Sequence, residues 1–76
     1  MVYLDPVYVI RFNDGSGFHV KSFRLTVMGG EVHVTLEPLE ALHFSSWEEA
    51  AAVVAFIVFH FNAELLGMLE VAKYLM

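Results

Sequence analysis

The longest hydrophobic run of the chain extends over residues 50–59 and contains no polar side chain. It follows Ser46 and Glu49, whose spacing is that of a capping box, in which the serine caps the helix and the glutamate bonds back to the preceding backbone. Glu48 and Glu49 would also lie near the positive end of the helix dipole. The pattern therefore predicts a helix that begins at Trp47.

At about 100° per residue, this helix has two apolar faces. The first is expected to pack on a sheet, and its members are Trp47, Ala50, Ala51, Val54, Ile57, Val58, Phe61 and Leu65. The second lies opposite, and we expect it to be an interface because exposed apolar patches often mark interaction sites. This predicted interface consists of Ala52, Phe56 and Phe59, with Glu48 and His60 at its rim. The alternative is that the C-terminal segment of the same chain covers Phe56 and Phe59.

Three segments before the helix are rich in β-branched and aromatic residues and alternate with polar ones, as strands do. Residues 7–12 and 18–27 are joined by residues 13–17, whose Asn, Asp and Gly suit a hairpin loop. After a turn at residues 28–30, residues 31–37 form the third strand. These segments predict an antiparallel meander with one apolar face.

In a regular strand, Val20 and Phe23 would point to opposite faces of the sheet, because they lie an odd number of positions apart. A bulge near residues 21–22 would return both side chains to the same face. The side chains expected to point inward from the second and third strands are Phe23, Leu25, Val27, Val32, Val34 and Leu36.

The end of the chain allows two interpretations. Gly67 is a typical residue to stop the helix, and residues 68–75 then form either a strand or a second helix, because short apolar runs suit both. We favour the strand, with Leu69, Val71 and Leu75 facing inward, and we expect residues 42–44 to be extended. The fold predicted for residues 1–76 is a single α+β domain, a three-stranded antiparallel meander packed by one long helix, with a possible fourth strand.

Composition adds a reason to expect a partner. The hydrophobic fraction is 58%, above the usual ~45–50%, and a domain of this size buries only about 60% of its unfolded surface. Oligomerisation or a partner protein would cover the surplus. The absence of cysteine favours a reducing compartment, the cytoplasm.

The net charge of −5 and four dispersed basic residues argue against direct nucleic-acid binding, which needs a basic face. Acidic side chains can instead meet a basic surface of another protein. The residues expected to form such an acidic contact face are Asp14, Glu31, Glu37 and Glu40.

The chain predicts no catalytic, cofactor-binding or metal site. Its four histidines lack metal-ligand spacing and are expected on a solvated sheet face, and no nucleophile elbow or phosphate loop is present. The first residues lack a signal-peptide pattern, and the apolar run is shorter than the roughly 20 residues that span a bilayer. We therefore expect neither an enzyme nor a membrane protein.

Two stretches, residues 8–15 (YVIRFNDG) and 39–50 (LEALHFSSWEEA), resemble a pattern of small orphan bacteriophage proteins. The resemblance implies a β-rich meander crossed by one helix. Several small acidic phage proteins of this kind inhibit bacterial defence, among them anti-CRISPR proteins that occupy a surface of an effector complex. The order of elements is also similar to that of β-β-β-α antitoxins of the RNase-H-like kind.

The leading functional expectation is a non-enzymatic phage-type inhibitor that binds a host protein, such as a CRISPR–Cas effector, and blocks it sterically in the cytoplasm of an infected bacterium. The alternative is a homodimeric regulatory or structural protein such as an antitoxin. In that alternative, Phe56 and Phe59 pack across a two-fold axis.

Overall fold

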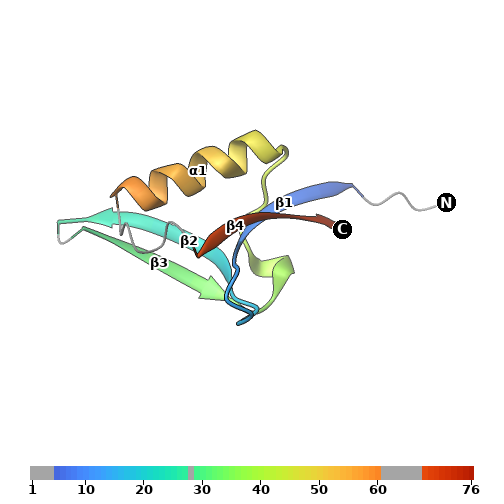
Figure 1. Ribbon diagram of the computed structural model, residues 1–76, viewed down its shortest axis with the longest axis horizontal. Helices are drawn as coiled ribbons and strands as arrows, with labels where there is room; N and C mark the ends of the chain where they lie inside the picture. The colour runs from blue at the N-terminus through green and yellow to red at the C-terminus, as the bar shows by residue number, and fades with distance from the viewer. Residues whose placement is uncertain (1–4, 28, 61–67) are drawn as a thin grey trace.

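The computed structural model of the chain describes residues 5–27, 29–60 and 68–76. Within these residues, four antiparallel strands form one sheet and a single α-helix packs on one of its faces, so the predicted α+β fold is confirmed (Figure 1). The sheet order is β3-β2-β1-β4. The elements are β1 (Pro6–Phe12), β2 (His19–Thr26), β3 (Gly29–Thr35), the 3-10 helix η1 (Pro38–Glu40), α1 (Trp47–His60) and β4 (Leu69–Leu75).

The C-terminal segment is a strand, which decides between the two interpretations of the sequence. β4 pairs with β1 in continuous register from Pro6↔Leu75 to Phe12↔Leu69. β1 is therefore an interior strand, and its Val9 and Ile10 are both completely buried, one on each face of the sheet.

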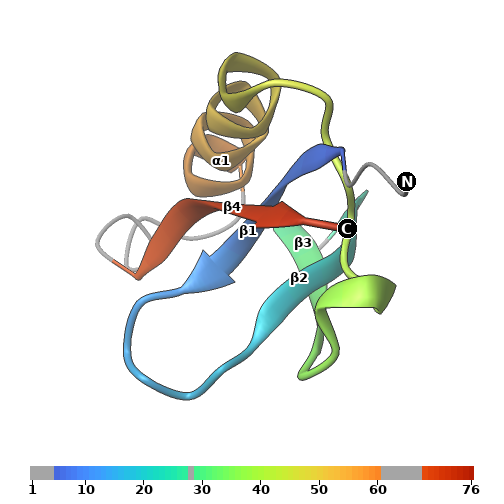
Figure 2. The ribbon, with the colours of Figure 1, turned by 90° about the vertical axis from the view of Figure 1, so that its right-hand side faces the viewer.

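β1 and β2 diverge after a single registered pair, Arg11↔His19. The gap between them is filled by the extended residues 42–44, as expected from the sequence (Figure 2). Phe44 and Tyr8 exchange two backbone hydrogen bonds of 3.0 and 2.8 Å, and the Leu42 N–H donates to the Val20 carbonyl at 3.0 Å. Residues 42–44 thus lead directly to the start of α1, which lies above β1.

The predicted bulge in β2 is confirmed. The β2–β3 register shifts between Val20 and Ser22. As a result, Val20 and Phe23 both pack in the core beneath the helix.

The predicted helix start and its cap are confirmed. The Ser46 hydroxyl accepts a hydrogen bond from the Glu49 N–H at 3.2 Å. The Glu49 carboxylate reaches one residue further back than in a standard capping box, accepting from the N–H and the hydroxyl of Ser45 at 3.1 and 2.8 Å.

Two hydrophobic clusters lie on opposite faces of the sheet. The larger one, beneath α1, is centred on Ile10, Val20, Ala50, Ile57 and Leu69. The smaller one, on the other face, contains Val9, Ala41 and Ala72, with Tyr74 packed against it. Since Ala50 and Ile57 are the buried residues of α1, they define the side of the helix that faces the sheet.

Trp47 does not belong to that side, so its predicted place in the core is wrong. It is 55% exposed and lies in a groove between α1 and β4. The reason is a rotation of the helix about its axis relative to the predicted orientation. Ala50 and Ile57 face the sheet centre, which turns Trp47 and Ala51 toward the sheet edge.

Several predicted inward positions are also wrong. Exposed fractions are 53% for Leu25 and 102% for Val27, because the far end of the β2–β3 hairpin extends past the end of α1 (Figure 1). Leu36 follows the end of β3 and Leu75 is the last residue of β4, and both are more than half exposed. Val34 is 40% exposed. Phe61, Leu65 and the predicted stop at Gly67 lie outside the described residues.

Candidate protein-binding surfaces

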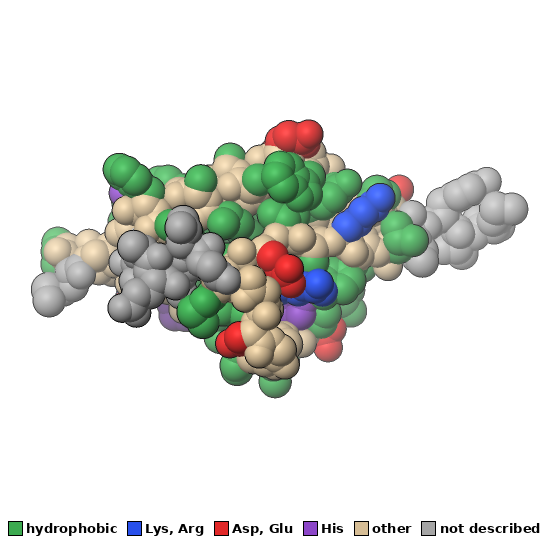
Figure 3. All heavy atoms as spheres, in the orientation of Figure 1, with side chains coloured by type: hydrophobic (Ala, Val, Ile, Leu, Met, Phe, Trp, Pro, Cys, Tyr) green, Lys and Arg blue, Asp and Glu red, His purple; other side chains and the backbone are tan. Residues whose placement is uncertain are grey.

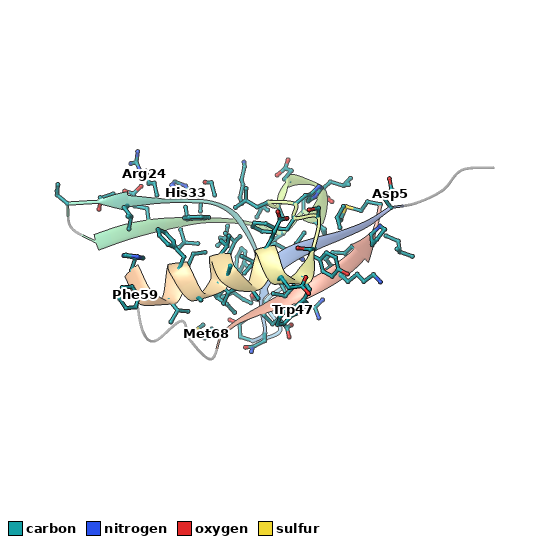
Figure 4. The ribbon with its side chains drawn as sticks, turned by 90° about the horizontal axis from the view of Figure 1, so that it is seen from above. Asp5, Arg24, His33, Trp47, Phe59 and Met68 are labelled. Atoms are coloured by element: carbon teal, nitrogen blue, oxygen red, sulfur yellow. The ribbon has the colours of Figure 1, made fainter. Side chains whose placement is uncertain are left out.

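The predicted interface on α1 is exposed. All five of its residues are exposed to solvent: Glu48, Ala52, Phe56, Phe59 and His60. Phe59 is the more exposed of the two phenylalanines among them, at 83%. Figure 4 shows Phe59 at the opposite end of α1 from Trp47. The described part of the C-terminal segment, β4, pairs with β1 and leaves Phe59 uncovered.

Three rings at the end of α1 form an aromatic cluster. The His60 ring lies 4.4 Å from that of Phe56 and 4.9 Å from that of Phe59. Phe56 also contacts Phe23 of β2, with ring centroids 5.9 Å apart, which explains why Phe56 is only 37% exposed. The cluster is therefore anchored to the sheet on one side and open to solvent on the other.

A second apolar surface lies between α1 and the edge strand β4. Here the structure forms a groove with a volume of about 380 Å³. Figure 3 shows hydrophobic side chains over α1 on this face, with acidic and basic side chains below them near β4. The groove is lined by Trp47, Ala51, Val54, Leu69, Glu70 and Val71.

Sequence reasoning missed this groove because it assigned Trp47 to the core. A signal was present, since Trp47 and Ala51 lie at one border of the predicted core face. A helix near the edge of a sheet leaves one border of its apolar face unpacked. Without knowledge of the strand order, that border could not be identified.

The four acidic residues predicted to form one contact face lie in separate local groups. Glu31 forms an ion pair with Arg24 across β2 and β3 at 2.7 Å, and this interaction lowers its pKa (Figure 4 labels Arg24). Asp14 accepts a hydrogen bond from the Ser16 N–H in the hairpin loop, and its hydrogen bonds to Ser16 lower its pKa.

Glu37 and Glu40 belong to the region of η1. The Glu37 carboxylate accepts from the Leu39 N–H at 3.4 Å, and the Glu40 carboxylate accepts from the Thr35 hydroxyl at 3.1 Å. The structure thus brings Glu37 and Glu40 together but pairs Glu31 with a basic residue elsewhere.

A polar cluster that the sequence did not predict lies where β1, β2 and β4 meet. The Arg11 guanidinium donates to Glu70 at 2.7 Å and to the Tyr74 hydroxyl at 3.2 Å. The same hydroxyl lies 3.0 Å from His19 Nε2. The hydrogen bond with Glu70 is the main cause of a raised pKa of Arg11.

His19 is only 4% exposed, so its predicted place on a solvated face is wrong. Its ring packs against that of Tyr74 at 5.8 Å, while its Nδ1 is buried and has no hydrogen-bond partner among the described residues. The cluster borders a cavity of about 330 Å³ beside the hairpin loop. Because it connects side chains of three strands at the single β1–β2 register pair, it holds the two halves of the sheet together.

Within the described residues, no group of three His, Cys, Asp or Glu side chains is placed to hold a metal ion. A helix long and apolar enough to cross a bilayer is likewise not found in that part of the chain. No family model, curated protein or solved structure matches the chain.

Proposed function

We propose that this chain binds another protein through the outer face of α1 and acts by covering part of that protein's surface. The observation that carries the proposal is the aromatic cluster of Phe56, Phe59 and His60. Phe59 is 83% exposed in the last turn of a helix whose buried side already packs on the sheet. A large aromatic side chain in this position is typical of an interface anchor.

The cluster combines two properties of a binding centre. Aromatic side chains have few rotatable bonds and a large apolar area, so ordering them on binding costs little entropy for the surface they bury. The contact of Phe56 with Phe23 restrains one of the three rings before any partner arrives. Preorganisation of this kind favours tight binding.

The partner class that we propose is a bacterial defence protein, such as a CRISPR–Cas effector, blocked by a phage-type inhibitor. The net charge of −5 supports a basic partner surface, as in the nucleic-acid groove of an effector. The resemblance of residues 8–15 and 39–50 to small phage proteins supports the same class.

The test is direct binding to purified effector complexes of several CRISPR types, each assayed for target cleavage with and without this protein. We expect one type to be bound and inhibited. Phe59→Asp should abolish that inhibition, because the charge would have to be desolvated in the interface. Leu39→Asp is the matched control, since Leu39 is 67% exposed on η1, away from the cluster.

Two outcomes contradict the proposal. In the first, no effector is bound or inhibited. In the second, an effector is inhibited equally well by the wild type and by Phe59→Asp, which would place the binding surface elsewhere.

A further inference from the structure

β4 is the last strand of the described sheet on its side, and half of its backbone groups point away from β1. Asp5 and Met76 exchange two backbone hydrogen bonds of 3.1 Å, and the Asn13 N–H donates to the Met68 carbonyl at 2.8 Å. In an antiparallel ladder the bonded pairs alternate. The N–H and C=O groups of Leu69, Val71, Lys73 and Leu75 are therefore directed to the open edge.

A backbone contact on β1 supports this assignment. Tyr8 lies opposite Lys73, yet its N–H and C=O bond with Phe44 instead of β4. The Tyr8–Lys73 pair is thus a non-hydrogen-bonded pair. An open strand edge of this length is a template for a further strand.

We propose that a second copy of this chain occupies this edge, with β4 pairing antiparallel to β4 about a two-fold axis at Ala72. Such a pair is isologous, so each contact occurs twice. An axis perpendicular to the sheet allows only registers in which outward-directed residues meet one another. The resulting sheet would continue through both copies, with the two helices on the same face.

The residues of β4 select the register centred on Ala72. In this register all four outward-directed residues are paired. Leu69 lies opposite Leu75 of the second copy and Val71 lies opposite Lys73, and the two-fold axis repeats both pairs with the copies exchanged. A register shifted one way places Lys73 opposite Lys73, and like charges directly opposite are destabilising. A register shifted the other way places Val71 opposite Val71 and leaves Leu75 without a partner among residues 69–75.

The side chains fit the same arrangement. Leu75 is 62% exposed, whereas the groove that begins at Leu69 is apolar and open. The two-fold axis brings Leu75 of each copy to the Leu69 end of the other copy's groove. Lys73 of the second copy would lie across from Val71, beside the exposed ring of Trp47, where a cation–π contact can form. Leu75, which is exposed in the monomer, would thus fill the groove between α1 and β4 of the other copy.

The first test is the oligomeric state of the full chain by light scattering and sedimentation. We expect twice the 8.6 kDa chain mass at micromolar concentration. Lys73→Pro should give a folded monomer, because proline removes an outward N–H without breaking a bond to β1. Lys73→Ala keeps the N–H and should remain dimeric, as its matched control.

The second test fixes the register. The chain has no cysteine, so Ala72→Cys introduces a unique thiol at the only position that pairs with itself. Non-hydrogen-bonded partners lie about 4.5 Å apart between Cα atoms, within the roughly 4.4–6.8 Å range of disulfides. We expect a cross-linked dimer on mild oxidation, and no cross-link when Lys73→Pro is added.

The chain's single tryptophan provides a third measurement. Trp47 lines the groove, so iodide quenching of its fluorescence should decrease as the protein concentration rises through the dimerisation range. A wild-type monomer would overturn the proposal. So would a dimer that survives Lys73→Pro but is lost in Phe59→Asp, since it would form through the aromatic cluster instead.

Discussion

Ile57 and Phe59 lie two positions apart on α1, but the structure gives them opposite roles. Ile57 is completely buried and Phe59 is 83% exposed. Replacing each by alanine therefore tests the division of the helix into a packed and a free side. Ile57→Ala removes three carbon atoms from the core. At ~0.8 kcal/mol of transfer free energy per buried carbon, this removal costs about 2.4 kcal/mol. The remaining cavity brings the expected loss to roughly 2–5 kcal/mol.

That loss is large for this chain. At about 0.05–0.15 kcal/mol per residue, a domain of this length is stable by roughly 4–11 kcal/mol. The transfer loss of about 2.4 kcal/mol alone should lower the Tm of Ile57→Ala by about 10–20 °C, taking ~4–8 °C per kcal/mol. Phe59→Ala should change the free energy of unfolding by no more than about 0.5 kcal/mol, as exposed substitutions usually do.

The assay is urea unfolding followed by far-ultraviolet circular dichroism, at one fixed protein concentration because association would add to the measured stability. Ile57→Val is the matched control, with an expected cost of about 0.5–1.5 kcal/mol. Equal losses for Ile57→Ala and Phe59→Ala would refute the reasoning, because Phe59 would then be a core residue.

Three further predictions follow from local contacts. Ser46→Ala removes the cap of α1 and should lower the free energy of unfolding by about 1 kcal/mol in the same urea assay. Tyr74→Phe leaves the buried His19 and the half-exposed Arg11 without their shared hydroxyl, and we expect a loss of about 1–3 kcal/mol by thermal or urea unfolding. Arg24 lowers the pKa of Glu31, so the ionised carboxylate stabilises the fold above its ordinary pKa, and this contribution is lost as the pH falls through the lowered value. An NMR titration of Glu31 should show its pKa return toward the ordinary value in Arg24→Gln.

The sequence predicted the local features of the fold well, because each depended on neighbouring residues. The capping pair Ser46 and Glu49, the bulge before Ser22 and the extended lead-in at residues 42–44 are all present. The fold class followed from the alternation of the strands.

The errors concern distant parts of the chain. Trp47 was assigned to the core because a helical wheel gives angles within the helix but not the rotation of the helix on the sheet. That rotation depends on β4 pairing with β1, a contact between the two ends of the chain. His19 was assigned to the surface because Tyr74, the ring that packs on it, is 55 residues away.

The candidate interface on α1 could be identified from the sequence, since Phe59 lies nearly opposite the buried Ile57 on a helical wheel and Phe56 lies beside Phe59. The groove and the open edge of β4 could not, because the strand order determines them. The aromatic cluster and the groove share one cause, a helix with more apolar area than one sheet can cover, whereas the open edge of β4 follows from the strand order alone.

The central claim, that the free side of α1 binds and blocks a defence protein, can be tested most directly by phage plating on bacteria with CRISPR immunity. Strains of several CRISPR types would express the wild type, Phe59→Asp or Leu39→Asp at equal levels. We predict that the wild type and Leu39→Asp restore plating on one strain and that Phe59→Asp does not. Full immunity in every strain, or equal restoration by Phe59→Asp, would contradict the claim.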